Sequence, residues 1–307
     1  MQLDHTRIAI RERGLLETID LALFVFREFA GPTLACGLLA IVPLVLINYA
    51  LVGWMAPTEL DGEVLGFRYM WNMTLLVFLE APLASVFIVA YLGPAVFLEE
   101  RTIRQIAGDV LRQALPLVLC QGLLRGVLIA WSLYLLTNRE EVSGWIEGFF
   151  MILLCLWSAA MRAFRPYINE IILLEKNPLI PRGTAITVNK RSAHLHGPYS
   201  GDLMVRWLGS AAITVLLVCL VVSTAVLTQG VLITDWPIHF SLEEGDVASN
   251  LDWFKLQVVY PACLWLVVIF LAVIRFLSYL DLRIRHEGWE VELLMRAEAL
   301  RLNMQLE

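Results

Sequence analysis

Residues 256–277 read LQVVYPACLWLVVIFLAVIRFL, and they run without a break into residues 278–302, SYLDLRIRHEGWEVELLMRAEALRL. The first stretch is long and apolar enough to cross a bilayer, which takes about 20 apolar residues. The second stretch carries four arginines among acids, namely Arg283, Arg285, Arg296 and Arg301. This part of the chain therefore predicts a membrane crossing, its exit and a tail that faces water.

The composition of the whole chain agrees with this reading. Of its 307 residues, 59% are hydrophobic and 17% are charged, and the mean hydropathy is +0.70. An average soluble domain is roughly half apolar and about a quarter charged. The excess falls into long apolar runs, which predicts an all-α, polytopic membrane helix bundle. We find no basic and aromatic surface of the kind that binds nucleic acid.

Six apolar runs are long enough to be spans. They cover residues 33–54, 73–98, 115–136, 145–164, 208–232 and 256–277. They define a transmembrane domain over 32–278, preceded by an N-terminal segment, 1–31, and followed by a C-terminal tail helix, 279–307. A leucine followed by an acid closes several apolar runs, which either reflects three duplicated helical hairpins or is coincidence.

Several segments between the spans have amphipathic patterns. Residues 15–29 form either a helix in the membrane interface or a helix packed on the bundle. A short amphipathic helix is expected within 101–114, and two short surface helices, 168–175 and 184–195, are expected within the polar loop 165–207. Pro82 and Pro94 predict a kink in the second span, because proline removes a backbone donor.

The tail changes its pattern at Gly288. Residues 280–285 alternate apolar and charged side chains, which would lie on opposite faces of an extended chain. From Trp289 onward the apolar spacing becomes helical. We therefore place a break at Gly288, between the membrane exit and a separate amphipathic helix.

The distribution of cations predicts the orientation. Nineteen of the 23 lysines and arginines fall on the side that holds both termini. Cytoplasmic loops carry an excess of these residues. We therefore expect a multi-pass protein of the bacterial inner membrane with both termini in the cytoplasm.

Two ionisable residues lie deep within the predicted spans, Glu80 and Arg125. Such groups are costly in a bilayer and usually face other helices or water. Their predicted depths differ by roughly 6 Å at about 1.5 Å per residue. They form either a structural ion pair that fixes helix register or part of a polar cavity.

Five cytoplasmic cations are candidate contacts for anionic lipid headgroups. They are Arg162, Arg165, Arg182, Lys190 and Arg191. The alternative is that they reflect the positive-inside bias alone.

No catalytic or cofactor-binding residues are assigned. The sequence has no GxSxG, Walker-type glycine loop or HExxH. Glu99 to Arg104 fits the EExxxR motif of some intramembrane proteases, but the histidines that such enzymes need within later spans are missing. His194 and His196 have an HxH spacing without a completing cysteine, so no metal site is assigned.

The segment Tyr279-Leu-Asp-Leu-Arg283-Ile-Arg285-His-Glu287-Gly288-Trp-Glu-Val-Glu-Leu resembles the YxDLRxRxEGxDxEL ending of a group of uncharacterised bacterial six-span proteins. Glu170-Ile-Ile-Leu-Leu-Glu175, followed by Asn189-Lys-Arg-Ser192, resembles the same group. Glu290 stands where the pattern often has aspartate. The group is similar to the membrane domain of some glycerophosphoryl diester phosphodiesterases. Their catalytic barrel needs roughly 200 residues, so the resemblance implies a membrane domain without that activity.

These observations predict a non-catalytic scaffold or accessory subunit. Membrane lipids are its expected partners, and other proteins would dock on the loop 165–207 and on the tail. The alternative is a small-molecule or lipid transporter with a polar site around Glu80 and Arg125.

Overall fold

The computed structural model describes residues 11–55, 67–99, 101–137, 144–181, 186–234 and 255–288. All regular structure in these ranges is helical, which confirms the predicted all-α bundle. The elements are α1 (Leu15–Glu28), α2 (Ala30–Val52), α4 (Phe67–Ala84), α5 (Val86–Val96), α6 (Ile103–Arg112), α7 (Ala114–Leu117), the π-helical turn η1 (Val118–Leu123), α8 (Val127–Thr137), α9 (Gly144–Phe164), α10 (Ile168–Leu174), α11 (Val188–His196), α12 (Ser200–Thr234), the π-helical turn η2 (Lys255–Val259) and α14 (Tyr260–Glu287).

Five helical stretches of the described chain are long and apolar enough to cross a membrane. They are Ala30–Val52, Arg68–Val96, Ile146–Phe164, Ser200–Ala225 and Gln257–Glu287. A sixth crossing is formed only if α7, η1 and α8 are taken together. The fold is therefore that of a polytopic membrane protein.

The third apolar run is not the straight span that the sequence predicts. Its two halves, Ala114–Leu123 and Val127–Leu136, meet at 60°. Gly126 has a φ of +84° at the bend, and a Cβ added to it would lie 2.4 Å from Leu154 Cδ1. Glycine tolerates both the left-handed backbone and the close approach. The bend places Arg125 at a helix break instead of mid-span.

The second run is divided at Ser85, three residues after Pro82, into α4 and α5. Pro82 has no N–H to donate to the carbonyl of Phe78, four residues earlier. Arg162 of α9 donates to that carbonyl instead, and also to the Leu79 carbonyl at 3.0 Å. The Pro82 carbonyl accepts from Ser85 Oγ at 2.8 Å. The backbone groups freed by the proline thus find side-chain donors, which a membrane interior requires.

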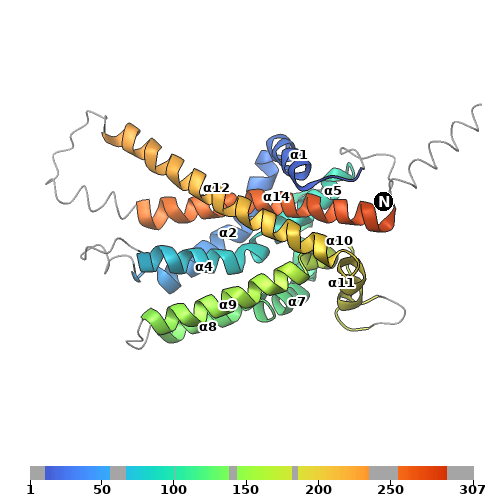
Figure 1. The fold of residues 1–307 in the computed structure, drawn as a ribbon, viewed down its shortest axis with the longest axis horizontal. Coiled ribbons are helices and arrows are strands. Elements are labelled where there is room, and N and C mark those ends of the chain that lie inside the picture. The colour runs from blue at the N-terminus through green and yellow to red at the C-terminus, as the bar shows by residue number, and fades with distance from the viewer. Residues whose placement is uncertain are drawn as a thin grey trace, which may run out of the picture.

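Helix α14 is the central element of the bundle. It contacts α1, α2, α4, α5, α11 and α12, and Figure 1 shows it running through the middle of the fold. It remains helical to Glu287 and ends at Gly288, whose φ is +67°. The extended conformation considered for residues 280–285 is therefore wrong, whereas the break at Gly288 is confirmed. The expected helix beyond Trp289 lies outside the described residues.

Helices α1 and α12 flank α14. Helix α1 packs on it through the buried residues Thr18, Ala22 and Val25, while Leu16 and Phe24 remain exposed. The helix packs on the bundle, as one of the two interpretations expects, and its other face is apolar and uncovered. Helix α12 crosses α14 obliquely and its far half diverges from the bundle (Figure 1). Its most apolar stretch has no buried residue.

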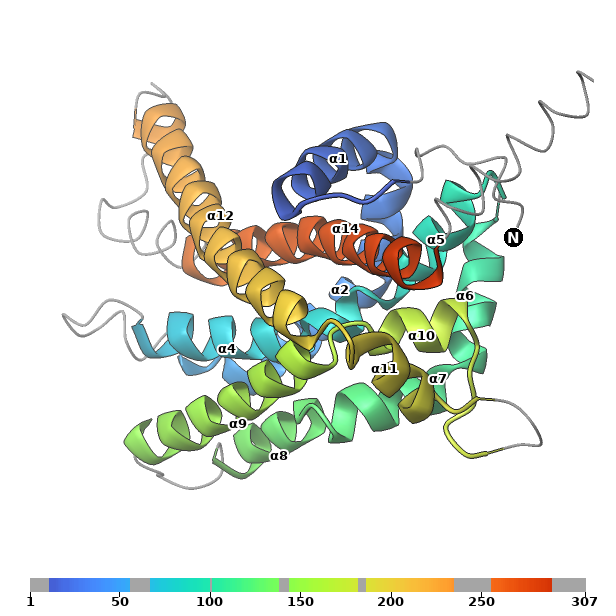
Figure 2. The same cartoon turned by 45° about the vertical axis from the view of Figure 1, so that its right-hand side comes forward.

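The short helices α6, α7, α10 and α11 gather at one end of the bundle, as Figure 2 shows. The predicted amphipathic helix within 101–114 is α6, which begins with a capping box between Thr102 and Gln105. The two helices expected within 165–207 are α10 and α11. Helix α10 is not on the surface, because residues 168 to 173 are all buried.

Candidate functional site

A cavity of about 700 Å³ lies among α4, α9, α12 and α14. This size is typical of small-molecule and cofactor sites. Along α9 its lining runs from Ile152 to Arg162, and along α14 from Leu264 to Ser278. At about 1.5 Å per residue, these distances correspond to about 15 Å of α9 and about 20 Å of α14.

The walls of the cavity are apolar for most of this length. The hydroxyl groups that occur there are turned to their own helix backbone, because Thr214 donates to the Ser210 carbonyl at 2.7 Å and Ser210 to the Trp207 carbonyl at 2.8 Å. Val215 and Leu156 line the cavity and are 64% and 62% exposed. The cavity is therefore open to the surface between α12 and α9, at the level of the apolar spans.

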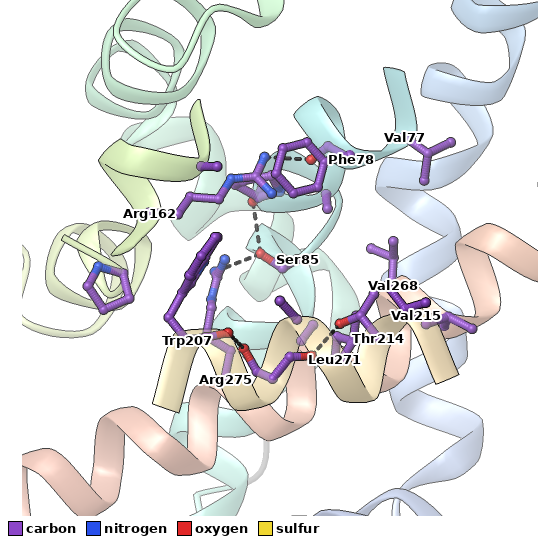
Figure 3. A pocket seen from close by; sticks show the side chains of 18 of the residues that line it. Val77, Phe78, Ser85, Arg162, Trp207, Thr214, Val215, Val268, Leu271 and Arg275 are labelled. Carbon is purple, nitrogen blue, oxygen red and sulfur yellow. Dashed lines mark hydrogen bonds between the residues drawn. The ribbon is translucent and has the colours of Figure 1, made fainter. Parts of the chain in front are cut away.

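One end of the cavity is basic. Arg125, Arg162, Arg206 and Arg275 all contribute to its lining there. Figure 3 shows Arg275 reaching Ser85 and Arg162 lying against Phe78, with Trp207 beside Arg275. Arg125 and Arg275 both repel Arg162 electrostatically, so the guanidinium groups form one cluster.

Arg125 lies in the bend before α8 and is 1% exposed. Its Nη2 donates to the carbonyl of Arg165 at 2.8 Å, just beyond the C-terminal end of α9. Carbonyls at that end of a helix lack intrahelical partners and attract cations. Nε and Nη1 of Arg125 have no hydrogen-bond partner within the described structure.

Arg275 connects three elements. Its Nε donates to Glu170 Oε1 of α10 at 2.8 Å, and its Nη2 donates to Ser85 Oγ at 2.8 Å. Glu170 is fully buried, and its second carboxylate oxygen has no partner in the described ranges. Asn169, next to it, donates to the Pro82 carbonyl at 2.6 Å and accepts from Gln121 of η1.

Glu80 belongs to a different polar group, on the other side of α4. It is fully buried, and its Oε2 accepts from Asn48 Nδ2 at 2.7 Å while its Oε1 accepts from Trp131 Nε1 at 2.6 Å. Within the described chain no ion pair joins Glu80 to Arg125, and Glu80 does not line the cavity. The two residues therefore serve separate sites.

A further buried polar group follows Glu80 toward the opposite end of α4. Glu147 accepts from Arg68 at 2.8 Å and from Asn72 at 2.9 Å. Tyr134 donates to Asn72 Oδ1 at 2.8 Å. These bonds join α4, α8 and α9, and they leave Glu147 fully paired.

The candidate headgroup cations fall into different environments. Arg162 lines the cavity, whereas Arg165 and Lys190 are exposed at the end of the bundle. Arg191 is paired with Glu175 at 2.6 Å and with Glu287, and the hydrogen bond that it donates to Glu175 raises its pKa. Arg191 is thus neutralised by acids of the same chain. Arg182 lies outside the described residues.

The two histidines of the HxH motif lie apart because residues two positions apart in a helix do not share a face. His196 is buried and stacks on Tyr167, with ring centroids 5.7 Å apart. Burial lowers the pKa of His196 to about 4. His194 contacts His286, and the described chain contains no cluster of three metal-ligating side chains.

Sequence reasoning missed Arg275, Glu170 and Ser85 as members of one site. The sequence pattern places Arg275 among the cations of the tail and residues 168–175 on the surface. The sequence does mark Arg275 and Glu170, because each of these charged residues interrupts an apolar run. What the sequence does not reveal is which helices bring these interruptions together.

Comparison with known protein families, with curated proteins and with solved structures finds no match to this chain. The cavity and its basic end are therefore interpreted from their own chemistry.

Proposed function

We propose that this membrane protein binds a lipid or similar amphiphile in the cavity among α4, α9, α12 and α14, as a non-catalytic lipid-handling or transport protein. The observation that carries the proposal is the shape and polarity of the cavity, which has apolar walls, one charged end and a side opening between α12 and α9. An opening on the apolar surface admits molecules dissolved in the membrane and does not admit a water-soluble substrate.

The length of the cavity fits a lipid that lies in one leaflet of the bilayer. The lining extends for about 15 Å along α9 and about 20 Å along α14, which is about half to two thirds of the roughly 30 Å hydrocarbon core of a bilayer. The basic end lies near Phe164, the last residue of α9, and beside α10. By the cation count this is the cytoplasmic end. A lipid of the cytoplasmic leaflet would place its headgroup there and its chain along the apolar walls.

The proposal includes the bacterial inner membrane as location and a cytoplasmic position for both termini. Its support is the excess of lysine and arginine on one side of the predicted spans. Reporter fusions at both ends, one active only in the cytoplasm and one active only outside it, test this orientation.

Cavity-filling substitutions test lipid binding. Ala211 lines the cavity, whereas its neighbour Ala212 on the same helix is exposed and does not. We expect Ala211→Phe to abolish copurification of lipid in mild detergent, measured by native mass spectrometry, and Ala212→Phe to leave it unchanged. Ala159→Leu, on the facing wall of α9, is the milder second variant. Equal lipid in the unmodified protein and all three variants would contradict the proposal.

A scaffold or accessory role is the second candidate. Its support is the network that holds α10, α11 and the end of α14 together, where Arg191 bridges Glu175 and Glu287. Ile180 and Leu111 near this end are 73% and 70% exposed. Affinity capture with the whole chain and with a chain ending at Gly288 tests it. A protein that copurifies only with the whole chain would support docking on the tail, whereas failed membrane insertion of the shorter chain would make the tail structural.

A further inference from the structure

The charged residues at the basic end of the cavity fall into a balanced and an unbalanced group. Arg206 pairs with Asp202 at 2.9 Å and with Asp281 at 2.8 Å. Arg285 pairs with the same Asp281 at 3.0 Å. Two arginines thus meet two aspartates, and this group needs no further charge.

The second group has an excess of cations. Arg275 pairs with Glu170, Arg125 lies close to both of them, and Arg162 lies close to Arg125 and Arg275. The other acid of this region, Glu175, is held by Arg191. Three guanidinium groups against one carboxylate leave two positive charges without a counterion in the described structure. Buried charges are costly unless they are paired.

Some N–H groups of these arginines also have no hydrogen-bond acceptor. Nε and Nη1 of Arg125 and Nε of Arg162 are buried and have no partner in the described chain. Arg125 is 1% exposed and lines the cavity. The bonds that these arginines do make go to backbone carbonyls of Arg165, Phe78 and Leu79, which are neutral. The carbonyls hold the side chains in place without neutralising them.

We propose that the basic end of the cavity binds a doubly charged phosphate-monoester group, with Arg125, Arg162 and Arg275 as its ligands. This inference rests on the proposed function, since the group is the headgroup of the lipid that fills the cavity. A phosphate monoester carries about −1.5 to −2 charges at pH 7 and matches the excess of two. A phosphodiester carries one charge and would leave one arginine uncompensated.

The choice of arginine supports an oxyanion of this shape. Its planar guanidinium has five donors in a fixed fork, which suits bidentate bonds to phosphate. Ser85 and Ser278 also line this end, but their hydroxyl groups already donate to the carbonyls of Pro82 and Ile274, so the arginines are the donors for the ligand. The apolar walls then accept the hydrocarbon part.

The test uses the full chain, purified in mild detergent and titrated with lipids of identical acyl chains. The probes are phosphatidic acid, phosphatidylglycerol and diacylglycerol, and bound lipid is measured by native mass spectrometry. We expect phosphatidic acid to bind most tightly at about pH 7.5. Its advantage over phosphatidylglycerol should shrink toward about pH 5, because the second ionisation of the phosphate lies near pH 6.

Variants identify the ligands. Arg162→Gln should weaken phosphatidic acid binding by about tenfold, as expected for one lost charge-assisted hydrogen bond, while diacylglycerol binding is unchanged. Arg162→Lys should recover part of the loss because it restores the charge. Arg104→Gln is the matched control, since Arg104 is exposed on α6 at the same end and does not line the cavity. Melting temperatures of all variants distinguish lost binding from lost folding.

Each contrary result has a distinct meaning. Equal binding of the three lipids would overturn the headgroup assignment and leave lipid binding intact. The absence of any bound lipid would overturn the proposed function. Inorganic phosphate at millimolar concentration is the last probe. If it raises the melting temperature of the lipid-free protein and lipid does not bind, the site takes free phosphate and the lipid assignment is wrong.

Discussion

Arg275 of α14 donates to the hydroxyl of Ser85, the residue at which α4 ends and α5 begins, across 2.8 Å. Ser85 in turn donates to the Pro82 carbonyl. The helix interruption that follows Pro82 in one span is thereby joined to an arginine of another span.

Ser85→Ala should destabilise the protein by about 1–3 kcal/mol, because it leaves a partly buried arginine donor without a partner, whereas the Pro82 carbonyl keeps its bond from Asn169. Equilibrium unfolding in mixed detergent micelles measures the change. Ser132→Ala is the control, since Ser132 is exposed and bonds only to the Leu128 carbonyl of its own helix. Similar losses in the two variants would show that the link to Arg275 contributes nothing.

Glu80→Gln should be tolerated, with a change in unfolding free energy of less than about 1 kcal/mol, whereas Glu80→Leu should cost at least about 2 kcal/mol. The oxygen of the Asn48 side chain has no partner in the described structure. A rotated Asn48 amide would accept from the new Gln amide, and Trp131 would keep its acceptor. The leucine leaves both donors unpaired. The same unfolding assay applies, and a large loss with glutamine would show that the charge itself is required.

Stability should decrease as the pH falls from about 6.5 toward 4, the window set by His196. Histidine has an ordinary pKa of about 6.5, and burial lowers the pKa of His196 to about 4. The unfolded chain therefore binds a proton in this window that the folded chain does not bind, which favours unfolding at lower pH. The expected loss of unfolding free energy at about pH 5 is about 2 kcal/mol relative to neutral pH.

His196→Asn should reduce that pH dependence in denaturant titrations at the two pH values. His194→Asn is the matched control, because His194 is exposed on the same helix. An unchanged slope in the His196 variant would assign the effect to another group. Tyr167, which stacks on His196, and the neighbouring Arg165 and Arg125 are the charged or titratable groups around it.

Gly126→Ala should destabilise the protein and weaken ligand binding. The added Cβ would meet Leu154 Cδ1 at 2.4 Å, and the φ of +84° is unfavourable for alanine. Leu154→Ala in the same chain should relieve the contact without removing the backbone cost. Gly108→Ala in α6 has open space around it and should stabilise its helix by about 0.5–1 kcal/mol. Melting temperatures and lipid retention give the comparison, and an unaffected Gly126 variant would mean that the bend is adaptable.

The sequence by itself determined the class of the protein and most of its helices. Apolar runs of about 20 residues have few alternatives to membrane-spanning helices, because unpaired backbone groups are too costly in a bilayer. The helix interruption after Pro82, the short helix after Thr102 and the helix end at Gly288 follow from equally local causes. Proline lacks a donor, threonine supplies a cap, and glycine accepts a positive φ.

Only the tertiary structure decided which polar residues meet. Glu80 and Arg125 have compatible depths in the sequence, yet Glu80 bonds to Asn48 and Trp131 while Arg125 turns to the end of α9. Depth along a helix follows from residue number, but the direction of a side chain depends on helix rotation and on the 60° bend at Gly126. For the same reason Glu170, Arg162 and Arg275 become one site only when α9, α10 and α14 pack together. Packing between distant segments sets that arrangement, and no local pattern in the chain encodes it.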